Sequence, residues 1–173
     1  LTGFDSSFTI SPGRLNIEDA YGVRMVVDYA HNGAGMMRIV ETLRPMTATG
    51  RRRCLLIAAR SRDLHRDMYF ALAEAAAEYF DYFVVAERGD IRAPTKPVQR
   101  PLGDSAELMV GCLREAGVAE VDIRVVLDTN EAVDAILEAA NPGDIILLAG
   151  INEYEEAWKK VRSFQPAWAT SAA

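Results

Sequence analysis

The sequence predicts a doubly wound α/β fold, with a mostly parallel sheet covered by helices on both faces. Short apolar runs alternate along the chain with segments whose apolar residues recur at helical spacing. The apolar runs lack polar alternation, which is typical of parallel strands buried on both sides. The chain has 173 residues, of which 50% are hydrophobic, so one domain with a proper core is expected.

The elements can be placed from these patterns. The runs that predict strands are Arg24–Asp28, Cys54–Ala58, Tyr82–Ala86, Ile123–Leu127 and Ile145–Leu148, with Leu15–Ala20 as a possible leading hairpin strand. The predicted helices are Gly35–Leu43, Asp67–Phe80, Ser105–Ala116, Asn130–Ala140 and Glu153–Phe164. Asp104 or Ser105, and Thr129 or Asn130, are candidate N-caps, and Arg88–Gly103 is the one long loop.

We expect an interdomain connector at 1–11, one domain at 12–166 and a frayed tail at 167–173.

Composition excludes several classes of protein. Cys54 and Cys112 are expected to be buried free thiols of a protein in the cytoplasm. No apolar run is long enough for a membrane span. The net charge of −6 argues against a nucleic-acid partner, and the run Arg51–Arg53 is interpreted as a solvated charge run.

Polar side chains gather where the run ending at Asp28 stops. Tyr29, His31 and Asn32 follow it, and Arg14 stands in a Pro-Gly bend shortly before. Ligands of open α/β sheets bind at the carboxyl ends of strands, where a carboxylate suits ribose hydroxyls and a guanidinium suits phosphate. The residues alone leave alternatives open. Asp28 could cap the next helix or meet Arg14, Arg14 could form a surface salt bridge, His31 could be structural, and Asn32 could serve only its turn.

Two further clusters follow other predicted strands. Arg60, Arg62 and Asp63 could receive an anionic group or belong to a solvated charge run. Asn152 could contact a substrate or simply cap the final helix. The sequence contains no GxxxxGK[ST], GxGxxG or metal-spaced cluster, so the loop that cradles ATP phosphates in a P-loop enzyme is missing from it.

At these residues the chain resembles a known family. Pro12-Gly13-Arg14 followed by Val27 to Asn32 resembles the opening of the C-terminal domain of Mur ligases, which are three-domain, ATP-dependent enzymes that form amide bonds. Arg14-Leu15-Asn16, the combination Asp28 to Asn32, and the segment Glu87–Arg92 look most like the cyanophycin synthetase branch. The resemblance covers about Ser11 to Phe164 and includes Asn141–Asp144 leading to Leu148–Gly150.

The resemblance implies a Rossmann-like sheet of about six strands that closes over ATP held by a central domain. By position, Arg14 would reach the ATP phosphates, Asp28 would bond the ribose, and Tyr29, His31 and Asn32 would line the nucleotide or the closing interface. The incoming amino acid would be met by residues among Arg60, Arg62, Asp63, Arg88, Arg92 and Asn152.

The chain departs from the family pattern at several positions. The glycine of a Gly-Asp-Arg-type motif is absent before Arg60, and Gly33 stands where the family usually has proline. A Gly-Lys-Gly-His-Glu motif is reduced to Gly150-Ile151-Asn152-Glu153, and an Asp-Asn-Pro-Arg motif is missing. The last two departures, the reduced Gly-Lys-Gly-His-Glu motif and the missing Asp-Asn-Pro-Arg motif, argue against a peptidoglycan enzyme that adds diaminopimelate or lysine.

The sequence therefore predicts the C-terminal domain of an ATP-dependent acid–amino acid ligase, similar to cyanophycin synthetase. N-terminal and central ligase domains are its expected partners, with Mg²⁺ and the phosphate-binding lysine held mainly by the central one. The fragment alone is expected to be inactive. The alternative is a stand-alone, non-catalytic α/β module that binds a nucleotide or another small molecule.

Overall fold

The computed structural model describes residues 8–47, 50–60, 65–88 and 101–170. Its strands are β1 (Asn16–Ala20), β2 (Val23–Asp28), β3 (Arg53–Arg60), β4 (Tyr82–Arg88), β5 (Ile123–Val125) and β6 (Ile145–Ala149). The α-helices are α1 (Gly33–Leu43), α2 (Arg66–Ala77), α3 (Asp104–Glu115), α4 (Thr129–Glu138), α5 (Tyr154–Arg162) and α6 (Ala167–Thr170). Short 3₁₀ turns lie at Arg44–Met46 and Glu120–Asp122.

The six strands form one sheet in the order β1-β2-β6-β3-β4-β5. β1 pairs antiparallel with β2, and every other pairing is parallel. The hairpin between β1 and β2 turns through Tyr21 and Gly22, which both have positive φ (53° and 76°), as a tight two-residue hairpin loop requires. β6, the last strand in the chain, is inserted between β2 and β3, so the sheet is Rossmann-like and doubly wound as predicted.

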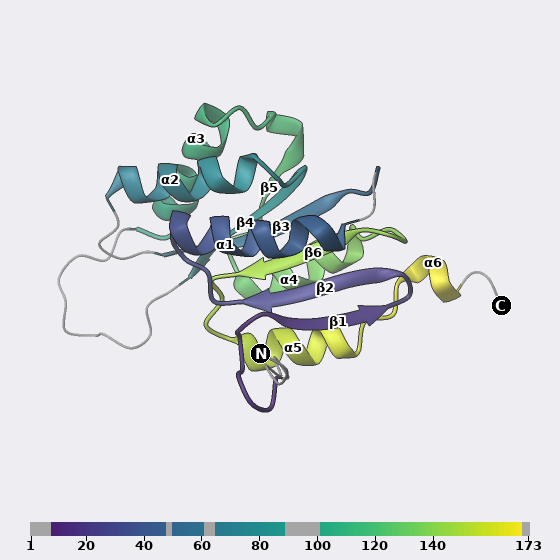
Figure 1. Cartoon of the computed structure of the whole chain (residues 1–173). Helices are drawn as coiled ribbons and strands as arrows, with labels where there is room; N and C mark the ends of the chain where they lie inside the picture. The colour runs from purple at the N-terminus through teal and green to yellow at the C-terminus, as the bar shows by residue number, and fades with distance from the viewer. Residues whose placement is uncertain (1–7, 48–49, 61–64, 89–100, 171–173) are drawn as a thin grey trace.

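Alternate side chains of the buried strands enter two separate cores. On one face, α1, α2 and α3 pack on side chains that include Val26, Leu55 and Leu147. On the other, α4 and α5 cover the intervening positions, among them Leu56 and Leu148 (Figure 1). Burial on both sides explains why these runs carry no polar alternation.

The structure corrects some element boundaries and caps. β5 ends at Val125 rather than Leu127, and the predicted caps of α3 and α4 are wrong. The N-cap of α4 is Asp128, whose carboxylate accepts the backbone N–H groups of Asn130 and Glu131. α3 begins after Gly103, with no capping side chain at its own N-cap.

Both ends of the described chain pack on the domain. Phe8, within the predicted connector, stacks on Trp158 of α5 with ring centroids 5.1 Å apart. The Trp168 indole N–H donates to the carbonyl of Ala140, so α6 is docked, which differs from the frayed tail expected there. Residues 1–7 and 171–173 lie outside the described part of the chain. Among the described residues, none of the helices is both long and apolar enough to cross a membrane.

Candidate functional site

The direction of the connections reverses at the carboxyl end of β6. After β2 and β3 the chain turns to the face covered by α1 and α2, whereas after β6 it turns to the opposite face, into α5. Connections that leave neighbouring strands in opposite directions open the crevice in which α/β sheets bind ligands. Parallel register places Asp28 beside Ala149, and Ala149 beside Ile57, three residues before Arg60. The expectation that Asp28, Arg60 and Gly150 share one edge is confirmed for their backbones.

The Asp28 carboxylate is engaged by the backbone. One oxygen accepts the Leu15 N–H at 2.8 Å and the other accepts the Ala30 N–H at 2.7 Å. Burial raises the pKa of this carboxyl, while the two hydrogen bonds and the nearby Arg14 charge act in the opposite direction. Asp28 therefore holds the turn before β1 against the end of β2, although each oxygen keeps a further lone pair for a ligand.

Arg14, Tyr29 and His31 form a row of planar groups at this edge. The Arg14 guanidinium lies over the Tyr29 ring, 5.6 Å from its centroid, and the rings of Tyr29 and His31 are tilted with centroids 5.1 Å apart. Arg14 is exposed and forms no salt bridge with any described residue. The salt bridge considered as an alternative is thus not found among the residues described.

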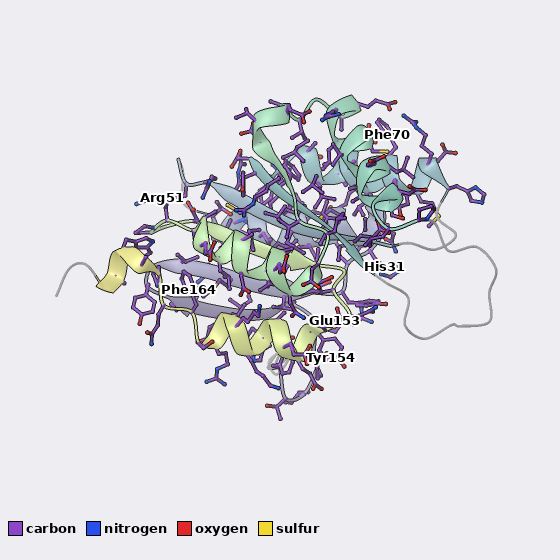
Figure 2. The ribbon with its side chains drawn as sticks, turned by 180° about the vertical axis from the view of Figure 1, so that it is seen from behind. His31, Arg51, Phe70, Glu153, Tyr154 and Phe164 are labelled. Carbon is purple, nitrogen blue, oxygen red and sulfur yellow. The ribbon has the colours of Figure 1, made fainter. Side chains whose placement is uncertain are left out.

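The His31 ring is held through one nitrogen. Its Nδ1 lies 3.0 Å from the carbonyl oxygen of Tyr29. Because a carbonyl oxygen only accepts, Nδ1 carries the hydrogen, and Nε2 is left for another partner. His31 is half-buried and lies on the side of the molecule where Glu153 and Tyr154 also lie, opposite Arg51 and Phe164 (Figure 2).

Asn32 and Gly33 shape the start of α1. Asn32 is its N-cap, and its side-chain oxygen accepts the Gly35 N–H at 2.8 Å, in agreement with the conformational interpretation. A Cβ at Gly33 would lie 2.7 Å from the carbonyl oxygen of Ala71 in α2. The absence of a side chain at position 33 therefore permits the close approach of the two helices.

The loop after β6 lies beside the end of β2, where the Gly150 N–H donates to the Asp28 carbonyl at 3.1 Å. Gly150 has φ +71°, and a Cβ there would lie 3.2 Å from the Ala30 carbonyl oxygen, so only glycine fits without strain. Helix α5 begins after Glu153, which means that Asn152 is not its cap. One carboxylate oxygen of Glu153 is buried and has no hydrogen-bond partner among the described residues. The sequence did not single out Glu153 as a candidate, because a glutamate before a helical run resembles any first-turn acid.

The remaining predicted contacts are only partly placed. Arg60 and Arg88 form the last register pair of β3 and β4, at the same edge, and the structure describes their backbones alone. Arg62, Asp63 and Arg92 lie outside the described residues. Among the residues that are described, no group of three or more His, Cys, Asp or Glu side chains could hold a metal ion.

Glu87 is a second residue that sequence reasoning missed. Its side chain is 5% exposed, and Oε2 accepts the N–H groups of Gly103, Ser105 and Ala106 at 2.9, 3.2 and 3.2 Å. The Glu87 carboxylate lies at the amino end of α3, where it accepts backbone N–H groups that have no partner within the helix. No local sequence pattern predicts these hydrogen bonds, because Glu87 and its partners are 16 to 19 residues apart.

The chain is similar in sequence to proteins of a known family. The family model described as Mur ligase, glutamate ligase domain, matches residues 13–152. The cyanophycin synthetase of Nostoc sp. is 29% identical over 152 residues, covering 86% of this chain and 15% of that protein. The UDP-N-acetylmuramoyl-L-alanyl-D-glutamate–2,6-diaminopimelate ligase of Corynebacterium efficiens is 33% identical over 142 residues, covering 80% of this chain and 25% of that protein. The chain thus spans a quarter or less of these relatives.

Solved structures support the fold. A UDP-N-acetylmuramoyl-L-alanyl-D-glutamate–2,6-diaminopimelate ligase superposes with a TM-score of 0.63 at 18% identity, covering 88% of this chain and 32% of that one. The folylpolyglutamate synthase of Mycobacterium tuberculosis, solved with ADP and AMPPCP, gives a TM-score of 0.60 at 21% identity, covering 90% of this chain and 33% of that one.

Proposed function

The chain belongs to the Mur ligase, glutamate ligase domain family, and we propose that it is the C-terminal domain of an ATP-dependent acid–amino acid ligase. In this proposal it closes over ATP and helps to position the incoming amino acid. The partners are the N-terminal and central domains of the same ligase, and the central domain holds most of the Mg²⁺ site. A cyanophycin synthetase-like enzyme is the form we favour, supported by the match to the Nostoc protein and by the missing Asp-Asn-Pro-Arg motif.

One observation carries the proposal: an exposed guanidinium stands at the ligand-binding edge of the sheet without a carboxylate partner among the described residues. Arg14 is held by a ring face, not by an acid, so its fork of N–H donors is open to an anion. The chemistry of this donor set fits the phosphates of ATP. Asp28, with a lone pair left on each oxygen, fits a ribose hydroxyl.

When bound, ATP supplies the phosphoryl group that activates a substrate carboxylate before an amine attacks it. The residues of this chain act by orientation and charge. Arg14 offsets negative charge that develops during phosphoryl transfer, and Tyr29 keeps its guanidinium in place. Glu153, whose buried carboxylate oxygen has no hydrogen-bond partner in the described part of the chain, suits the ammonium group of an amino acid.

The test uses the ligase polypeptide that carries this domain. Arg14→Ala should lower turnover about a hundredfold, because losing one charged, preorganised contact costs about 3 kcal/mol in the transition state. Arg44→Ala is the matched control, since Arg44 also lies over a tyrosine ring, that of Tyr79, but pairs with Glu78. Phosphate release is measured at saturating ATP and amino acid. Normal turnover in Arg14→Ala would remove the residue on which the proposal depends.

The isolated chain offers a second test. Because the sequence lacks a phosphate-cradling GxxxxGK[ST] loop, we expect no ATP hydrolysis above background and only weak nucleotide affinity. Isothermal titration calorimetry with and without Mg²⁺ measures the affinity. Tight, magnesium-dependent ATP binding by this chain alone would contradict the assignment of the phosphate loop to another domain and would favour a stand-alone binding module.

A further inference from the structure

The position of Arg14 depends on an unusual turn. Gly13 and Leu15, the residues on either side, both have positive φ, 69° and 48°. For leucine this conformation is strained, so surrounding contacts must hold it. Arg14 itself is exposed, lies over the Tyr29 ring and forms no salt bridge within the described part of the chain, so the backbone of the turn sets its place.

The side chain of Asn16 stabilises this turn through two hydrogen bonds to its backbone. Asn16 is the first residue of β1, pairs with Val27 and is fully buried. Its Oδ1 accepts the Gly13 N–H at 2.6 Å, and its Nδ2 donates to the Ser11 carbonyl at 3.1 Å. A buried amide that satisfies one donor and one acceptor of the same loop fixes that loop in a single conformation.

The turn is then fastened to the strand that carries the rest of the site. The Gly13 carbonyl accepts the Tyr29 N–H at 2.9 Å, so Asn16 supports the same peptide that meets Tyr29. The path from Asn16 to the Arg14–Tyr29 pair passes through one residue, Gly13.

We propose that Asn16 is a positioning residue of the ligase reaction, whose buried amide places the Arg14 guanidinium at the phosphate end of the nucleotide. This inference rests on the proposed function. A displacement of about 1 Å in a charged contact can lower a rate on the order of a hundredfold, so loss of the amide should be felt in catalysis.

A double-mutant cycle in the ligase polypeptide tests the proposal. Asn16→Ala should lower kcat/KM for ATP about tenfold or more when Arg14 is present. In the Arg14→Ala background the same change should lower it less than about twofold, because the residue that Asn16 positions is gone. Asp144→Ala is the matched control. Asp144 is also buried and accepts backbone and arginine N–H groups, but it lies at the opposite edge of the sheet.

Hydrogen exchange of the Gly13 amide in the 173-residue chain is the second readout. It should be protected in the parent and exchange at least about tenfold faster in Asn16→Ala, while core amides keep their protection. If Asn16→Ala fails to fold, Asn16→Asp, which keeps the oxygen that accepts from Gly13, replaces it in the cycle.

The outcomes separate the two claims. An Arg14→Ala variant with normal turnover would overturn the proposed function, and this inference with it. A severe Arg14→Ala defect together with an equal Asn16→Ala effect in both backgrounds would overturn the positioning role alone. Unchanged exchange at Gly13 in Asn16→Ala would do the same, as would an equal loss of kcat/KM in Asp144→Ala.

Discussion

Replacing Asp28 by alanine should destabilise the fold as well as the proposed site. The change removes both acceptors that hold Leu15 and Ala30, and leaves two backbone N–H groups without their partners. Hydrogen bonds to an ionised group contribute about 1.5–3 kcal/mol each. Burial is the largest influence on the pKa of Asp28 and opposes ionisation, so we take the lower part of that range. For the two bonds together, the expected loss is about 3–4 kcal/mol.

For a domain of this size, that loss corresponds to a fall of about 6–16 °C in Tm. Differential scanning calorimetry of the chain measures it. Asp19→Ala is the matched control, because Asp19 pairs with Arg24 on the same hairpin but is exposed, and such pairs contribute about 0–1 kcal/mol. An Asp28→Ala melting temperature no lower than that of Asp19→Ala would refute the structural role.

The proposed ribose contact needs a separate test, because Asp28→Ala disturbs the turn that carries Arg14. ATP that lacks a ribose hydroxyl removes the contact from the substrate side and leaves the protein intact. If Asp28 bonds the ribose, the deoxygenated nucleotide should raise KM in the parent ligase but not in Asp28→Ala. An equal increase in both would assign Asp28 to the turn alone.

Two further predictions concern stability. Glu87→Ala should lower the free energy of unfolding by about 2–4 kcal/mol, because three N–H groups lose one buried acceptor. Urea titration measures this loss, and a value below about 0.5 kcal/mol would contradict the stabilising role of Glu87 at the start of α3. Burial raises the pKa of the Cys54 thiol from 9.0 to about 12, so the folded chain should resist Ellman's reagent at pH 8. Because this folded-state pKa is raised, the contribution of Cys54 to stability is complete below about pH 9 and is lost as the pH rises towards 12. Rapid labelling of Cys54 in the native state would contradict both expectations.

The fold could be predicted from the sequence because its signals are local. Each buried strand appears as a short apolar run, and each helix repeats apolar residues on one face. The hairpin of β1 and β2 was also predicted, because Tyr21-Gly22 separates Leu15–Ala20 from the next strand-like run. The insertion of β6 between β2 and β3 was not predicted, because strand order depends on which faces the helices cover and leaves no mark in any single segment.

The site was predicted less completely, for the same physical reason. The strand-end position of Asp28 to Asn32 was readable, and Asn32 showed its turn role in the Asn-Gly pair. The bonds from Asp28 to Leu15 and from Glu87 to Gly103 join residues 13 and 16 positions apart. No spacing rule reports such contacts, so neither the bond from Asp28 to Leu15 nor that from Glu87 to Gly103 was predicted.

The hydrogen bonds of Asp28 also bear on the availability of Arg14. The positive charge of Arg14 acts to lower the pKa of Asp28, and an Arg14–Asp28 salt bridge was one of the alternatives that the sequence left open. Instead, the Asp28 oxygens point to the N–H groups of Leu15 and Ala30. A guanidinium already paired with a carboxylate would have to lose that partner before it could bind phosphate, which weakens binding. Arg14 pairs with no carboxylate among the described residues, so its guanidinium donors are available to an anion.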